Sequence, residues 1–253
     1  MRLKFFCLNL WGVGGIFDKA LDFLVKEKPD IICLQEVFDG QAEKLEPGFR
    51  ALSLLKEKLD LHYHFYSPAF TDNRKEGRIV QGNAIFSKWP IFGSHTAFFD
   101  RPYQEDYAEI EENYPFVPRN VQQAVIKKDN VTLNIFNTQG IWGKNGYDNE
   151  RRIKFSQLVV DLVEDKENVI LSGDFNVNEG TKSINILEEH LNNIFKDDKR
   201  QSSFNLKRKT NPGYATAVVD FIFASPSIKV VSHKMPSVDV SDHLPLIAEL
   251  EIR

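Results

Sequence analysis

The sequence predicts an α/β layered fold in which two sheets pack face to face and helices cover the outside. Strand-like apolar runs outnumber the helical segments, and the strands arrive in pairs with helices between them. Hydrophobic residues make up 42% of the 253 residues, which is enough to bury one large core. Because no repeat or linker interrupts the chain, we expect a single domain over residues 1–253.

Runs rich in β-branched and aliphatic residues predict the strands. Two further segments, 103–118 and 196–212, lack these patterns and are expected to be long loops. The predicted strands cover residues 3–10, 30–35, 62–66, 82–87, 92–98, 120–127, 131–138, 168–173, 218–224, 229–233 and 244–252.

Apolar positions at helical spacing predict four helices between these strands. Asp18 can cap the first helix, which Pro29 closes. The second is expected over residues 41–61 with a break at Pro47-Gly48, and the third over residues 148–164. Thr181 can cap the fourth.

The charge of the chain is nearly balanced, with a net value of −4. A protein that coats a polyanion is usually basic, so bulk charge gives no support to extended nucleic-acid binding, although a local basic groove remains compatible with it. No apolar run reaches the length of a membrane span. The apolar N-terminal stretch is short and alternates like a strand rather than a signal peptide. We therefore expect a cytoplasmic monomer without a membrane span.

The segment Ser172-Gly173-Asp174-Phe175-Asn176 follows a short apolar run that we interpret as a buried strand. Gly173 permits a sharp turn at its end. In an extended chain Asp174 and Asn176 point to the same side, which places a carboxylate beside a carboxamide. That pair suits an activated water and a developing oxyanion, although Asp and Asn are also common in simple turns.

Polar residues also end or interrupt the other predicted strands. A carboxylate within a strand is costly to bury unless it is paired, and His243 would pair with Asp220 while Asp220 orients its imidazole. Taken singly, each polar residue is explained by a turn or a helix cap, but together they indicate a catalytic edge of the sheets. The set is Asn9, Glu36, Gln139, Asp174, Asn176, Asp220, Asp242 and His243.

This set of residues predicts metal-assisted phosphoester hydrolysis. Oxygen donors without a Cys or His cluster suit Mg²⁺ or Mn²⁺ and argue against zinc. Because Mg²⁺ takes only one or two carboxylates, Glu36 is enough as the main ligand. We expect Asp174 to orient or deprotonate the attacking water, and Asn176 and His243 to hold phosphate oxygens where charge builds.

Six short motifs occur in a fixed order: Leu8-Asn9, Leu34-Gln35-Glu36-Val37, Gly82-Asn83-Ala84-Ile85-Phe86-Ser87, Ser172-Gly173-Asp174-Phe175-Asn176, Val219-Asp220-Phe221-Ile222 and Ser241-Asp242-His243. In this order the chain resembles the endonuclease/exonuclease/phosphatase superfamily over essentially its whole length. The resemblance implies a four-layer α/β/β/α sandwich with two mixed sheets. It also implies that Asn9 and Glu36 shape the metal site, that Asp242 is a second metal-side acid, and that Asp220 orients His243.

One position departs from the family pattern. Many members carry a histidine in an Asn-Thr-His stretch, where this chain has Asn137-Thr138-Gln139-Gly140. Gln139 can donate a hydrogen bond to phosphate but cannot supply a proton as an imidazolium does. Two readings follow: an active phosphodiesterase or nuclease with a neutral phosphate ligand, or a catalytically weakened module that binds phosphate or nucleic acid.

The sequence does not choose among a nucleic acid, a phospholipid headgroup and a phosphorylated metabolite as the substrate. Besides Gln139, the expected substrate-binding residues are Trp142 and Lys144, which closely follow it, and Asn83. Several aromatic residues near the expected loops can stack on a base or meet a lipid or sugar. They are Trp11, Tyr103, Tyr107, Tyr114, Trp142 and Tyr147.

Overall fold

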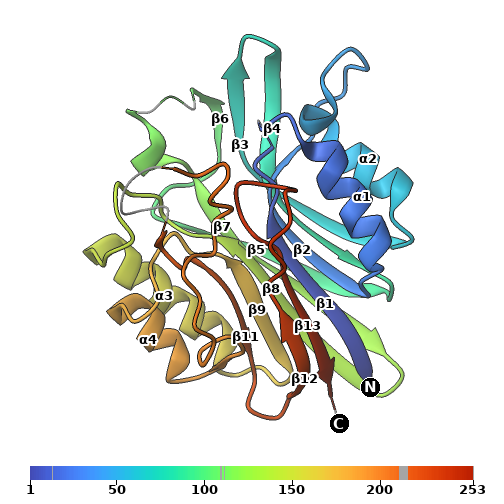
Figure 1. Cartoon of the computed structure of the whole chain (residues 1–253), viewed down its shortest axis with the longest axis vertical. Coiled ribbons are helices and arrows are strands. Elements are labelled where there is room, and N and C mark those ends of the chain that lie inside the picture. Colours follow the sequence, from blue (N-terminus) through green and yellow to red (C-terminus); the bar gives the residue numbers. More distant parts are fainter. Residues whose placement is uncertain (13, 109, 111, 211–215, 253) are drawn as a thin grey trace.

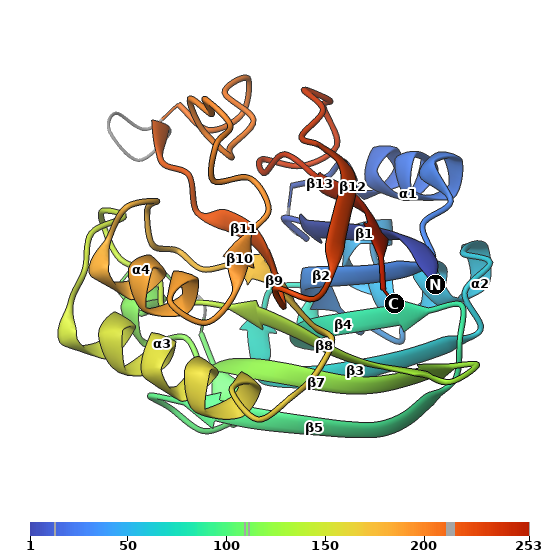
Figure 2. The ribbon, with the colours of Figure 1, turned by 90° about the horizontal axis from the view of Figure 1, so that it is seen from below.

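Two mixed β-sheets lie face to face, and helices cover the outer side of each (Figure 1, Figure 2). The computed structural model describes residues 1–252 except 13, 109, 111 and 211–215. The arrangement confirms the α/β/β/α sandwich expected from the order of strands and helices.

The first sheet has seven strands in the order β12-β13-β1-β2-β4-β3-β6. Its centre is the parallel pair β1 and β2, and β13 and β4 flank this pair antiparallel to it. The carboxyl ends of β1 and β2 therefore meet at one edge. The strands are β1 (Arg2–Asn9), β2 (Ile31–Phe38), β3 (Tyr63–Arg74), β4 (Gly77–Ser87), β6 (Gln104–Tyr107), β12 (Lys229–Lys234) and β13 (Leu246–Glu251).

The second sheet has six strands in the order β10-β11-β9-β8-β7-β5. Here β8 and β9 run parallel, whereas β11 runs antiparallel to β9. The start of β11 therefore lies at the same edge as the ends of β8 and β9. The strands are β5 (Ile91–Phe99), β7 (Arg119–Lys128), β8 (Val131–Gln139), β9 (Val169–Asp174), β10 (Asn192–Asn193) and β11 (Asp220–Ala224).

Apolar side chains fill three interfaces between the layers. One cluster lies between the two sheets, a second joins α1 (Phe17–Glu27) and α2 (Ala51–Lys58) to the first sheet, and a third joins α3 (Glu150–Val163) and α4 (Lys182–Glu188) to the second sheet. For this reason every residue of the central strand β9 is buried, and the strand begins with the apolar run Val169-Ile170-Leu171. Among the described residues, none of the helices has the length and apolar composition needed to cross a bilayer.

Two helix predictions need correction. The helix expected over 41–61 is shorter, because Pro47 begins a 3-10 turn, η1 (Pro47–Arg50), and regular helix starts only after it. Asp18 does not cap α1; the N-cap position is Ile16, which makes no side-chain cap hydrogen bond. The cap at Thr181 is confirmed, since its side chain accepts the Ile184 N–H at 3.5 Å.

The sheets also extend into segments that the sequence did not mark as strands. β3 and β4 form a hairpin longer than the predicted strands 62–66 and 82–87, because the pairing continues through residues 67–74 of β3 and 77–81 of β4. The expected loop 103–118 contains β6 and a 3-10 turn, η2 (Tyr114–Phe116). Residues 109 and 111 of the first expected loop, and residues 211 and 212 of the second (196–212), lie outside the described part of the chain.

Candidate functional site

The ends of the central strands bring polar side chains to one cleft. Asn9 ends β1, Gln139 ends β8, Asp174 ends β9, and Glu36 lies near the end of β2. Asp220 reaches the same edge because it begins the antiparallel β11. The cleft has a volume of about 160 Å³ and is lined by Trp11, Glu36, Tyr114, Arg119, Gln139, Trp142, Asp174, Asn176, Phe204, Lys209, Asp242 and His243.

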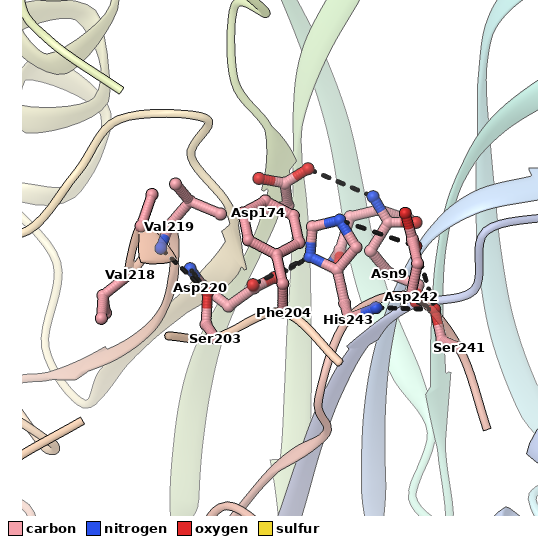
Figure 3. A network of polar contacts seen from close by, with 12 residues as sticks. Asn9, Asp174, Ser203, Phe204, Val218, Val219, Asp220, Ser241, Asp242 and His243 are labelled. Atoms are coloured by element: carbon pink, nitrogen blue, oxygen red, sulfur yellow. Dashed lines mark hydrogen bonds and ion pairs between the residues drawn. The ribbon is translucent and has the colours of Figure 1, made fainter. Parts of the chain in front are cut away.

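His243 is a buried, charged imidazole held by Asp220 (Figure 3). Its Nδ1 lies 2.9 Å and 3.1 Å from the two carboxylate oxygens of Asp220. The Phe204 ring packs against the imidazole with a centroid distance of 4.5 Å. Burial lowers the pKa of His243, but the charges of Asp220 and Asp242 outweigh it and raise the pKa to about 10. The ring therefore carries a positive charge at neutral pH.

Asp174 and Asn176 are joined by two hydrogen bonds. The Asn176 backbone N–H donates to Asp174 Oδ1 at 3.0 Å, and Asn176 Nδ2 donates to Oδ2 at 3.1 Å. The expected extended geometry was wrong: Asn176 has a φ of 55° and Gly173 a φ of 154°, so a turn makes the contact. A Cβ on Gly173 would lie 2.0 Å from the Thr138 carbonyl oxygen, which requires glycine there. Burial is the main cause that raises the pKa of Asp174, which makes it a stronger base.

Glu36 lies in a β-bulge of β2, where the register with β4 shifts and its own φ is 55°. Its Oε1 accepts from Asn9 Nδ2 at 3.1 Å and from Gln139 Nε2 at 2.8 Å. Asn9 Nδ2 also donates to Asp174 Oδ2 at 3.1 Å. The Arg119 guanidinium donates to Gln139 Oε1. One network of hydrogen bonds therefore connects both sheets across the bottom of the cleft.

Asp242 lies beside His243 and forms an ion pair with Lys209. Its Oδ2 accepts from Lys209 Nζ at 3.2 Å, and the side chain of Asp242 is 6% exposed. Ser241 Oγ donates to the Asn9 carbonyl at 2.7 Å, which ties this loop to the end of β1 (Figure 3). The loop before β13 therefore closes one side of the cleft.

Residues 8–243 match the model of the Endonuclease/Exonuclease/phosphatase family. The chain belongs to this family. Its members are generally hydrolases that act on phosphoester bonds. The match confirms the resemblance drawn from the six motifs, all of which fall within residues 8–243. None of the curated proteins compared with the chain matches it.

Solved structures of other proteins share the family fold. An endonuclease/exonuclease/phosphatase from Beutenbergia cavernae DSM 12333 has a TM-score of 0.72 at 19% identity, over 99% of this chain and 72% of that one. D. rerio TDP2, solved with a single-strand DNA product, has a TM-score of 0.72 at 17% identity, over 99% of both chains. The mannosyl-6-phosphatase of Bacteroides thetaiotaomicron VPI-5482 has a TM-score of 0.68 at 18% identity, over 99% of this chain and 100% of that one.

Family enzymes commonly depend on a divalent metal, and the cleft has donors that fit one. Ligand atoms of Asp174, Asp220 and His243 lie within 4.8 Å of one another. Because Asp220 directs both oxygens at His243, we interpret that pair as a hydrogen-bonded unit rather than as metal ligands. Glu36, Asp174 and Asp242 all line the cleft, and no cysteine is among its described lining residues. This oxygen-rich set fits a hard cation.

The structure brings most of the predicted site residues together, but not all. Trp142 lines the cleft, whereas Asn83 and Lys144 are not among its described lining residues. Asn83 is 3% exposed and donates to Asn120 Oδ1 at 3.0 Å between the sheets, so its position does not support substrate binding. Asn9 directs its Nδ2 at two carboxylates and accepts the Trp11 N–H at 3.0 Å on Oδ1, which favours an orienting role over metal ligation.

Arg119 and Phe204 also line the cleft, and no sequence pattern singled out either residue. Arg119 immediately precedes the predicted strand 120–127 and is the first residue of β7, 6% exposed. Its signal was a single charge at the start of an apolar strand. Phe204 lies in the expected loop 196–212 and carried no signal, because only the fold places it against His243.

Proposed function

We propose that this chain is a Mg²⁺- or Mn²⁺-dependent hydrolase of phosphoester bonds. The observation that carries the proposal is the convergence of two units on one cleft. One is the Asp220–His243 pair at 2.9 Å, and the other is the Asp174–Asn176 pair at 3.1 Å. Phosphoester hydrolysis needs a cation that stabilises the phosphate oxygens and a carboxylate that takes a proton from the attacking water, and these two units would supply them.

Each residue has a distinct role in this proposal. Asp174 orients the attacking water and takes its proton, and burial supports that role by raising the pKa of the carboxyl group. The charged His243 donates from Nε2 to a phosphoryl oxygen, while Asp220 holds the ring from the other nitrogen. Asn176 lines the cleft and steadies Asp174 through two hydrogen bonds, and its Nδ2 also donates to the Gly140 carbonyl at 3.3 Å.

Glu36 is the proposed main metal ligand, with Asp242 as a second acid on the metal side. When bound, the metal polarises the phosphoryl group and stabilises the leaving oxygen. Asn9 and Gln139 donate to Glu36 Oε1 and so fix the direction of the carboxylate. Lys209 and Arg119 add positive charge along the cleft for the substrate phosphate.

A catalytically weakened binding module is the second candidate, and the contacts of Gln139 favour it. Gln139 donates to Glu36 and accepts from Arg119, so both ends of its carboxamide are already used within the protein. In the proposed enzyme it acts as a support for Glu36 rather than as a proton donor. In a binding module the same residues would hold phosphate without turnover.

The test is release of p-nitrophenol from bis(p-nitrophenyl) phosphate and from the monoester, with Mg²⁺ or with EDTA. We expect metal-dependent turnover in the wild-type chain and its loss in Glu36→Gln and in His243→Ala, both folded by circular dichroism. Glu43→Gln removes one carboxylate at an exposed position away from the cleft and should keep the wild-type rate. Equal rates in all variants would refute the proposed site. Metal binding without turnover on either ester would support the binding module.

A further inference from the structure

Part of the cleft lining is aromatic, and the proposed chemistry does not use this feature. Trp11, Tyr114 and Trp142 line the cleft together with charged and amide side chains. None of its described lining residues has an aliphatic side chain. An acyl chain binds to aliphatic surface, whereas a flat ring binds to aromatic faces, so this lining favours a planar group on the phosphate.

Trp11 lines the cleft in a strained backbone conformation. Its φ is 48°, which is rare for a bulky residue and concentrates at functional sites. Its ring lies directly on Gly14, where an added Cβ would stand 2.0 Å from Trp11 Cε3. The backbone N–H of Trp11 donates to Asn9 Oδ1 at 3.0 Å, and Asn9 Nδ2 in turn donates to Glu36 and Asp174. The ring is thereby fixed relative to the two carboxylates of the cleft.

A cation lies against the same ring. The Arg208 guanidinium is 5.9 Å from the Trp11 ring centroid, and an ion pair with Asp239 holds it there, with Nη2 2.7 Å from Oδ2. Asp239 also accepts from Lys19 at 3.0 Å and from Asn205 at 3.0 Å. Trp11 is therefore packed by fixed groups rather than left to move, so its ring edge has a defined position in the lining of the cleft.

A second aromatic unit lines the cleft from another part of the chain. Tyr114, in η2, and Trp142, three residues beyond the end of β8, meet edge to face with ring centroids 5.5 Å apart. Gly140 fixes the segment between Gln139 and Trp142, because a Cβ there would lie 2.0 Å from the Phe175 carbonyl oxygen. Both units thus line the same cleft as the proposed water and phosphate ligands.

We propose that these aromatic residues form a subsite for the base of a nucleotide whose phosphate binds at His243. The proposal rests on the proposed function and names its substrate class as a nucleotidyl group. The size of the cleft limits the ligand to about one base. The volume of about 160 Å³ is small for a ligand site.

The test is binding, measured in EDTA by calorimetry so that no turnover occurs. Adenosine 5′-monophosphate and ribose 5-phosphate carry the same phosphate and differ by the base. We expect the base to increase the affinity of the wild-type chain at least about fivefold, the low end of what one stacked base contributes. Equal affinities would overturn the subsite. A loss of hydrolysis in the p-nitrophenyl assay, by contrast, tests only the proposed function.

Two variants assign the effect to the aromatic residues. In Trp142→Leu and in Trp11→Leu, the ratio of the affinity for adenosine 5′-monophosphate to that for ribose 5-phosphate should fall toward one. Trp142→Phe keeps an aromatic ring and should retain most of the wild-type ratio. Tyr147→Leu is the matched control, because Tyr147 is 68% exposed on the same loop and is not among the lining residues. If Tyr147→Leu lowers the ratio as much as Trp142→Leu, or if neither cleft variant lowers it, the subsite is refuted.

A single-stranded 12-mer distinguishes a free nucleotide from the end of a strand. Affinity for a dinucleotide equal to that for the 12-mer would support a site for one base, as proposed. Affinity that rises steeply with strand length and falls steeply with salt would overturn the limit to one base and indicate a track for nucleic acid.

Discussion

Asp174 and Asp220 lie directly opposite each other on the antiparallel strands β9 and β11, and both are buried. Like charges at opposite positions of a ladder are destabilising. His243 resolves this conflict, because its ring is charged and a ligand atom of each carboxylate lies within 4.8 Å of a ring nitrogen. The imidazolium is therefore part of the stability of the sheet edge as well as of the proposed chemistry.

Removal of His243 should destabilise the protein and not only inactivate it. His243→Ala leaves two buried carboxylates without their cation, and we expect the free energy of unfolding to fall by about 3 kcal/mol. Adding Asp220→Asn removes one of those charges, so the double variant should recover part of the loss. Urea denaturation of the four proteins of the cycle measures this coupling. Strictly additive losses would contradict the pairing.

The same cycle separates orientation from chemistry. Asp220→Asn is expected to lower kcat/KM mainly by misorienting His243 and reducing its charge. Combined with His243→Ala, it should therefore cost little more than His243→Ala alone. An independent effect of Asp220→Asn on top of His243→Ala would show that Asp220 acts elsewhere.

Glu36 should show a conflict between stability and activity. Its φ of 55° is unfavourable for any residue with a Cβ but not for glycine. Glu36→Gly should therefore unfold with a free energy about 1 kcal/mol higher than that of Glu36→Ala. Both variants lack the carboxylate and should lack metal-dependent hydrolysis. Thermal unfolding compares them, and a more stable alanine variant would show that this backbone conformation is not strained.

Gln139 should matter as a bridge between Arg119 and Glu36. Gln139→Leu keeps the size of the side chain but leaves the buried Arg119 and the half-buried Glu36 each short of a hydrogen bond, at a cost of about 1–3 kcal/mol in unfolding free energy. Hydrolysis should fall as well, since Glu36 loses a donor that orients it. Gln123→Leu, which removes one hydrogen bond elsewhere in the same sheet, is the control. An equal loss of hydrolysis in both variants would argue against the bridge.

Sequence patterns predicted the buried strands, the polar residues at their ends and the pairing of Asp220 with His243, because each of these depends on local chemistry. Buried strands such as β9 carry an unbroken apolar run, and the parallel pairing of β8 with β9 brings Gln139 and Asp174 to one edge, where such runs end in polar residues. The Asp220–His243 pair followed from the cost of an unpaired buried carboxylate.

Features that depend on the fold as a whole were not predictable in this way. The contact of Asn176 with Asp174 arises from a turn with positive φ, which alternation along a strand does not describe. Phe204 and His243 are far apart in the sequence, and no periodic pattern of residues predicts their contact. Asn83 lies in strand β4 and belongs to one of the six motifs that carry the family resemblance. Its side chain nevertheless points between the sheets toward Asn120 and not into the cleft.

Asp148 gives a prediction for acid stability away from the cleft. It precedes α3 but accepts from the first turn of α4: Oδ2 from the Lys182 N–H at 2.7 Å, and Oδ1 from the Ser183 N–H at 2.9 Å. Burial raises the pKa of Asp148, but the hydrogen bonds from Ser183 and Lys182 outweigh it and lower the pKa below its usual 3.8.

A carboxyl group whose pKa is lowered on folding stabilises the protein above its unfolded pKa, and this stabilisation is lost as the pH falls through the folded value. Asp148→Asn should therefore be less stable than the wild type at pH 6, by about 1 kcal/mol, as is typical for a charge at a helix N-terminus. The difference should shrink as the pH falls below 3.8. Denaturation midpoints between pH 6 and pH 3 measure it, and a difference that stayed constant would assign the loss to packing rather than to charge.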